Sequence, residues 1–178
     1  MEFIKRNPKI FILSGKARSG KTETAKIIEN YYKEKKCITI SFAYYLKDYI
    51  KRITGWDGNE NTKPRELLQH LGIELIKNNI DDKLLINRVL QDIEVFSYFY
   101  DIIIISDARL VDEVESIKNK YINSVSIRIS NNDNNNLTEE QKNHITETGL
   151  DNYNNFDYFV NNYYSNLENE IENILRSV

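Results

Sequence analysis

Apolar residues gather in five short continuous runs, each about as long as a buried β-strand. The runs are Lys9–Ser14, Cys37–Phe42, Asp101–Ser106, Ser124–Ile129 and Phe156–Val160. A strand that is covered on both faces of a parallel sheet lacks the polar and apolar alternation of a half-exposed strand. The runs therefore predict a five-stranded, mainly parallel sheet, with the most apolar run, Asp101–Ser106, at its centre.

The segments between these runs carry helical spacing. In the segment that starts at Thr22, for example, Ala25, Ile28 and Tyr32 fall on one helical face. Further helices are predicted at Tyr44–Ile53, from Lys63-Pro64 through Ile76, and at Leu84–Tyr98, Val111–Lys120 and Leu167–Leu175. Strands that alternate with helices predict a three-layer α/β fold, in which ligands gather at the carboxyl ends of the strands.

One long polar stretch, Asn131–Asn143, interrupts this alternation. A loop of that length in a compact domain is either a lid or disordered. The chain contains no internal repeat and no linker, so we expect residues 1–178 to form one domain. Within it, we expect a helical substrate-binding region at about 43–100 and a lid at about 130–146.

Composition and charge exclude several classes of protein. Cys37 is the only cysteine and the chain has 2 histidines, so an intramolecular disulfide and a four-thiolate zinc site are impossible. A formal net charge of −3 lacks the basic footprint of duplex-binding proteins, so a nucleic-acid polymer is not an expected partner. No apolar run approaches the roughly 20 residues of a membrane span. We expect a cytoplasmic protein without membrane attachment.

The strongest chemical signal is a phosphate-binding loop. The residues Gly15-Lys16-Ala17-Arg18-Ser19-Gly20-Lys21-Thr22 match G-x-x-x-x-G-K-(S/T), with a predicted strand before them and a predicted helix after them. The two glycines let backbone N–H groups turn toward an anion at the positive end of that helix. Lys21 is expected at the β- and γ-phosphates and the Thr22 hydroxyl on Mg²⁺.

Asp107 is the predicted carboxylate partner of this magnesium ion, acting through water. It follows the apolar run that ends at Ser106, so the strand would deliver it to the same edge of the sheet as the phosphate loop. The alternative is that Asp107 only caps the helix that follows at Leu110–Lys120.

Neither an ATPase nor a GTPase switch fits the sequence. Asp107 is followed by Ala108 rather than by the glutamate with which ATPases activate water, and Asn119-Lys120 does not continue as the guanine-reading N-K-x-D. Transfer of the phosphoryl group to a second bound anion remains. Such in-line transfer relies on Mg²⁺, lysine and arginine rather than on a general base.

Transfer to an anion requires cations between the phosphate loop and the acceptor. The candidates at predicted element ends are Lys47, Arg65, Arg109 and Arg128. Each of them alone could be a solvated surface charge. The polar stretch and His144 behind it could close over the donor as a lid and keep water out.

Several segments occur together in one order: Leu13–Gly15 and Arg18–Lys21, Phe42-Ala43 with Leu46-Lys47, Arg65–Ile76, Ser106–Arg109 and His144–Leu150. On these segments the chain resembles the phage-type deoxynucleoside monophosphate kinase family, a branch of the P-loop nucleoside monophosphate kinases that is related to phosphomevalonate kinase. The resemblance spans nearly the whole chain. The chain departs from the residues usual in this family at Ile73, Leu84–Ile86 and Ser130. These departures leave the identity of the acceptor base and of the donor nucleotide undetermined.

The resemblance implies a viral enzyme that passes the γ-phosphate of ATP to a deoxynucleoside monophosphate, with Mg²⁺ as cofactor and a homodimer as a possible assembly. It implies that Lys47, Arg65 and Gln69 line the acceptor pocket, where the amide of Gln69 would read a base edge. Asp107 and Arg109 would act with Lys21 at the phosphates, and Arg128 and His144 on the donor and lid side. Two alternatives stay open: a kinase of phosphomevalonate or dephospho-coenzyme A type, and a nucleotide-binding regulator without catalysis.

Overall fold

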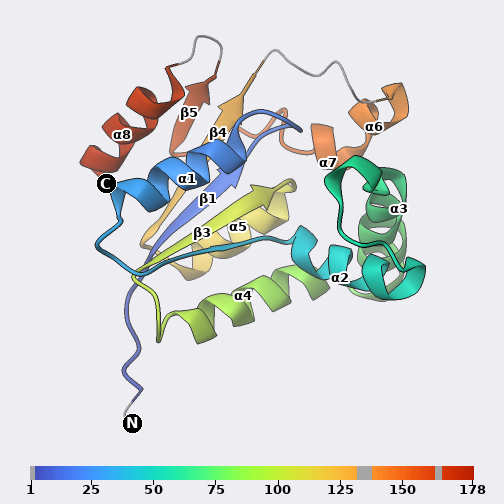
Figure 1. Cartoon of the computed structure of the whole chain (residues 1–178), viewed down its shortest axis with the longest axis horizontal. Coiled ribbons are helices and arrows are strands. Elements are labelled where there is room, and N and C mark those ends of the chain that lie inside the picture. Colours follow the sequence, from blue (N-terminus) through green and yellow to red (C-terminus); the bar gives the residue numbers. More distant parts are fainter. Residues whose placement is uncertain (1–2, 132–137, 163–165) are drawn as a thin grey trace.

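Five parallel strands form one sheet in the order β2-β3-β1-β4-β5. Figure 1 labels β1, β3, β4 and β5 among them. The structure is a computed structural model that describes residues 3–131, 138–162 and 166–178. The strands are β1 (Lys9–Ser14), β2 (Cys37–Ile40), β3 (Ile102–Ala108), β4 (Ser124–Ser130) and β5 (Tyr158–Asn161). The predicted α/β fold with a five-stranded sheet is confirmed. The sheet is parallel throughout, and β1 rather than β3 holds the central place.

Helices cover both faces of the sheet (Figure 1). Helices α1 (Lys21–Tyr31) and α8 (Leu167–Ser177) pack on one face, and α4 (Leu84–Phe96) and α5 (Val111–Lys120) on the other. Successive residues of β1 serve the two faces, since Phe11 lies in the cluster with α1 and α8 and Ile12 in the cluster with α4 and α5. Burial on both faces explains the continuous apolar runs. Within the described ranges, no helix is long and apolar enough to cross a membrane.

The strand β3 ends later than its apolar run predicts. It continues through Asp107 to Ala108, so Asp107 lies inside the strand rather than after it. The register pairs Ser14, the last residue of β1, with Ala108. Because β1 and β3 are parallel neighbours, Asp107 and the phosphate loop after Ser14 both lie at the carboxyl ends of the strands.

A helical unit beside the sheet layers follows β2 (Figure 1). It contains α2 (Ala43–Thr54), a 3₁₀ turn (Glu60–Thr62), α3 (Arg65–His70) and a π-helix (Leu71–Ile80). The predicted helical stretch through Ile76 is therefore present, as the α-helix α3 up to His70 and as a π-helix from Leu71 onward. Leu71 and Ile76 both pack toward Ile50 of α2, and their five-residue separation matches the i→i+5 hydrogen bonds of a π-helix.

The polar stretch predicted as a loop contains helical residues. Helix α6 spans Glu139–Asn143 and α7 spans Ile145–Thr148. Thr138 Oγ1 accepts the Gln141 N–H at 3.2 Å, and the Gln141 side chain bonds back to the Thr138 N–H at 3.4 Å. This capping box, T-x-x-Q, is a helix-start signal that corrects the loop prediction. Residues 132–137 of the predicted lid lie outside the described residues.

Candidate functional site

The phosphate loop has a backbone that only particular residues can adopt. Gly15, Arg18 and Gly20 have φ angles of 154°, 63° and 108°. A Cβ atom on Gly15 would lie 2.3 Å from the carbonyl oxygen of Ile129, so a larger residue does not fit there. Gly20 precedes α1 and has no side chain with which to cap it. The first N–H groups of α1 are thus available to an anion.

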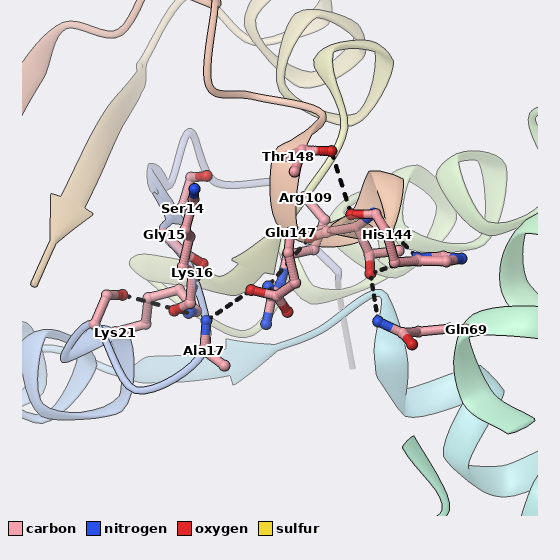
Figure 2. Close-up of polar contacts among 12 residues, drawn as sticks. Ser14, Gly15, Lys16, Ala17, Lys21, Gln69, Arg109, His144, Glu147 and Thr148 are labelled. Carbon is pink, nitrogen blue, oxygen red and sulfur yellow. Dashed lines mark hydrogen bonds and ion pairs between the residues drawn. The ribbon is translucent and has the colours of Figure 1, made fainter. Parts of the chain in front are cut away.

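Lys21 is held at the loop by main-chain carbonyls. Its Nζ donates to the oxygens of Gly15 and Lys16, both at 2.7 Å (Figure 2). Burial, followed by the charge of nearby Arg109, lowers the pKa of Lys21 to about 7. The negative charge of a phosphate would offset both effects and favour the ammonium form.

Asp107 joins the edge of the sheet to α2. Its Oδ1 accepts the Phe42 N–H at 2.8 Å and its Oδ2 accepts the Ala43 N–H at 2.9 Å. These are the first N–H groups of α2, so Asp107 caps α2 and not the helix that follows it in sequence. Each carboxylate oxygen can accept a further hydrogen bond, so a water molecule on a metal ion remains a possible partner.

Glu113, rather than Asp107, caps the start of α5. Its Oε2 accepts the N–H groups of Arg109, at 2.7 Å, and Leu110, at 3.0 Å, at the start of α5. Burial raises the pKa of Glu113 to about 7. Sequence reasoning missed this residue, although a glutamate at the third position of a helix is a known capping signal.

Arg109 reaches toward the phosphate loop and meets Glu147. Its Nη1 donates to Glu147 Oε1 at 2.6 Å and to the carbonyl of Thr146 at 3.2 Å. The other oxygen of Glu147, Oε2, accepts the N–H of Ala17 in the phosphate loop at 2.9 Å (Figure 2). Glu147 belongs to the recognised segment His144–Leu150, but nothing in the sequence assigned it a role.

Arg128 lies beside the loop rather than in the cavity described below. It sits on β4 next to Ser14, to whose Oγ it donates at 3.0 Å. Asp151 connects it to the loop, because its two oxygens accept from Arg128 Nη2 at 3.1 Å and from Lys16 Nζ at 2.8 Å. The placement supports a role in shaping the loop, and sequence reasoning missed Asp151.

Basic side chains face one another where α2 and the start of α3 line the cavity described below. Lys47 on α2 and Lys63, just before α3, both donate to Glu60, each at 3.1 Å. Arg65 begins α3 and lines the same cavity. Burial lowers the pKa of Lys63. Lys63 was not predicted, because before the turn at Glu60–Thr62 is known it reads as one more surface lysine.

The amide of Gln69 is connected to α7. Its Nε2 donates to Thr146 Oγ1 at 3.2 Å, and this hydroxyl also lies 3.0 Å from His144 Nδ1. His144 caps α7, since its Nδ1 accepts the Thr146 N–H at 3.3 Å, and it is not part of the cavity wall. The expected role of His144 on the donor and lid side stays a prediction. Burial, with His70 acting in the same direction, lowers its pKa.

A cavity of about 680 Å³ joins these groups, a size typical of small-molecule sites. Of the predicted residues, its wall contains Ala17, Arg18, Lys21, Thr22, Lys47, Arg65, Gln69, Asp107 and Arg109. The residues that sequence reasoning missed are Lys63, Glu113, Thr146 and Glu147. In the described part of the chain, no three His, Cys, Asp or Glu side chains form a metal cluster.

The sheet order and the phosphate loop define a fold that solved structures of several small-molecule kinases share. Solved structures with this fold include the shikimate kinase of Aquifex aeolicus, at 13% identity over 94% of both chains with a TM-score of 0.51. A putative kinase from Chloroflexus aurantiacus has 12% identity over 97% of this chain and 96% of that one, with a TM-score of 0.51. TT1252 from Thermus thermophilus has 12% identity over 97% and 96%, with a TM-score of 0.53.

Residues 45–174 match the family model of deoxynucleotide monophosphate kinase. The match covers more than half of the chain, which therefore belongs to this family of phosphotransferases. The family indicates deoxynucleotide monophosphate kinase activity and implies the use of ATP. The phosphate loop precedes the matched residues, so it is an independent observation. No curated protein sequence matches the chain.

Proposed function

We propose that the cavity holds both substrates of this kinase, with the triphosphate of ATP at the phosphate loop and a deoxynucleoside monophosphate between α2, α3 and α7. The observation that carries the proposal is the continuity of one cavity wall from Lys21 and Thr22 to Lys47, Arg65 and Gln69. A phosphoryl group can pass directly between two anions only if both lie in one site that excludes water.

The donor half would bind the triphosphate mainly with backbone N–H groups. The positive φ angles at Gly15, Arg18 and Gly20 belong to the kind of backbone that can turn N–H groups toward an anion. Lys21 would leave the loop carbonyls and follow the negative charge as it moves from the γ-phosphate to the acceptor.

Thr22 and Asp107 fit a magnesium ion that is held largely by phosphate oxygens. Both side chains line the cavity, and the two oxygens of Asp107 are already engaged by the N–H groups of α2. A contact to the metal through water suits a carboxylate in this position. Bound there, Mg²⁺ would neutralise charge on the transferring phosphate.

The acceptor half combines cations with an apolar wall. Lys47, Lys63 and Arg65 would hold the 5′-phosphate, which would displace Glu60 from the two lysines. The apolar wall of Leu68, Ile73 and Ile76 suits a base, whose edge the Gln69 amide could read. The phosphate oxygen that attacks is already ionised near neutral pH, so no general base is needed.

An acceptor survey tests the proposed function. ATP and Mg²⁺ are incubated with each deoxynucleoside monophosphate in turn, and ADP release and the nucleoside diphosphate are measured. We expect a diphosphate with at least one of these acceptors and none with phosphomevalonate or dephospho-coenzyme A. ADP release with no deoxynucleoside acceptor above background would overturn the proposal, and nucleotide binding without any product would favour a regulator.

A further inference from the structure

Glu147 is a buried carboxylate inside the candidate site that the mechanism above does not use. Its side chain is 9% exposed and extends from α7 between the phosphate loop and Arg109 (Figure 2). Both of its oxygens are engaged, one by the Ala17 N–H at 2.9 Å and one by Arg109 Nη1 at 2.6 Å. A buried negative charge is costly unless it is paired in this way.

The contacts of Glu147 leave one edge of Arg109 open. In the described part of the chain, both side-chain hydrogen bonds of Arg109 use Nη1, which donates to Glu147 and to the carbonyl of Thr146. A guanidinium group has five N–H donors in a rigid plane. The donors on Nη2 and Nε are therefore oriented by Glu147 and remain available to bind a phosphate through two parallel hydrogen bonds.

Glu147 also counters repulsion between cations. The charge of Arg109 lowers the pKa of Lys21, whereas the charge of Glu147 raises it. Two cations that bind the same phosphate must approach each other, and a carboxylate bonded to one of them reduces their electrostatic repulsion.

We propose that Glu147 is a positioning residue for phosphoryl transfer, an inference that rests on the proposed function. Its carboxylate fixes Arg109 to the phosphate loop at Ala17, so that the guanidinium and the loop N–H groups meet the transferring phosphate in one geometry. Thr146, the preceding residue, contacts Gln69. The short helix α7 thus contacts the donor loop through Glu147 and the acceptor side through Thr146.

Glu147→Gln tests the proposal because it keeps the size of the side chain. The two donors bond to different oxygens of Glu147, and glutamine replaces one of these oxygens with an NH₂ group that cannot accept, so it loses the bond to either Ala17 or Arg109. We expect kcat to fall about 10- to 100-fold, as when a group that acts on the transferring phosphate is slightly misplaced. We expect the KM for the acceptor to stay within about threefold and ATP to bind equally well or more tightly, because one negative charge near the phosphates is gone.

Two comparisons separate positioning from a general effect on the fold. Glu172→Gln removes the carboxylate from another glutamate–arginine pair, with Arg176 on α8, and should leave kcat unchanged. In an Arg109→Ala background, Glu147→Gln should change kcat by no more than about twofold, since the group that it positions is absent. If the double variant loses the product of the two single-variant losses in kcat, the two residues act independently and the proposal is overturned. A wild-type kcat in Glu147→Gln would overturn it as well.

The outcomes also separate this inference from the proposed function. A wild-type protein that makes no nucleoside diphosphate would refute both, whereas an active wild type with a neutral Glu147→Gln would refute the inference alone. If the glutamine variant does not fold, Glu147→Asp replaces it, because aspartate keeps the charge but is too short to reach both partners. The same loss of kcat is then expected, and normal turnover by the aspartate variant would contradict the proposal.

Discussion

The two halves of the cavity are built in different ways. The half that we propose for the donor is one stretch of chain, residues 15–22, whose conformation follows from its own glycines and from the strand and helix on either side. The half that we propose for the acceptor combines residues 43–70, which form α2, the turn and α3, with α7, which lies far from them in sequence. A local site can be recognised from a motif, whereas an assembled site needs tertiary packing to become visible.

Two carboxylates connect the halves. Asp107, near the end of β3, caps α2. Glu147 on α7 connects Ala17 to Arg109, and its neighbour Thr146 contacts Gln69. If this comparison is right, substitutions in the loop should affect the donor and substitutions in α3 the acceptor, whereas loss of the Asp107 carboxylate should affect both and loss of the Glu147 carboxylate should lower kcat.

The largest effect is expected from Lys21→Ala, which breaks the donor half alone. Loss of the ammonium that follows the migrating charge should lower kcat by about 10³-fold. Steady-state rates at saturating acceptor measure this loss. Lys26→Ala, on the exposed side of the same helix, is the matched control and should retain full activity. Comparable activity in the two variants would contradict the assignment of the donor site.

Asp107→Asn should damage both halves. The amide can accept only one of the two N–H groups at the start of α2, so the free energy of unfolding should fall by about 1–3 kcal/mol. We expect a loss of kcat of about 100-fold, together with a higher acceptor KM, because α2 carries Lys47. Thermal melts and kinetics against both substrates test this. Asp48→Asn on the surface of α2 is the control. An unchanged acceptor KM in Asp107→Asn would show that Asp107 does not support the acceptor site through α2.

Arg65→Ala should affect the acceptor half alone. Removal of a charged hydrogen-bond donor from the 5′-phosphate should raise the acceptor KM by on the order of 10- to 100-fold, with the KM for ATP unchanged. The exposed Arg52, paired with Asp48 on α2, gives the control Arg52→Ala. A rise in both KM values would mean that the halves are not separable at α3.

The affinity for ATP should fall as pH rises above about 7. Burial and Arg109 lower the pKa of Lys21 to about 7 in the free protein, and a bound triphosphate raises it, so binding above this pH takes up a proton. From pH 6 to pH 8 the Kd should rise about tenfold. Calorimetric titrations in two buffers of different ionisation enthalpy measure the proton uptake. A Kd that is independent of pH in the wild type would contradict this charge state of Lys21.

The sequence predicted the sheet and the place of the phosphate loop between β1 and α1, because their signals are local. Apolar runs mark doubly covered strands, and Gly15 and Gly20 stand where the loop needs left-handed angles. The partners of Asp107 were not predictable, because capping of α2 depends on how β3 and α2 pack. Lys63 and Glu147 were missed for the same reason, since no periodicity shows which charged side chains will face a common cavity.

The account depends on one cavity that holds both substrates, and a bisubstrate compound tests this most directly. In such a compound, adenosine and a deoxynucleoside are joined by a chain of five phosphates. We predict that it competes with ATP and with the accepted deoxynucleoside monophosphate, binds more tightly than either, and loses affinity in both Lys21→Ala and Arg65→Ala. Competition with only one substrate, or unchanged binding in either variant, would contradict the account.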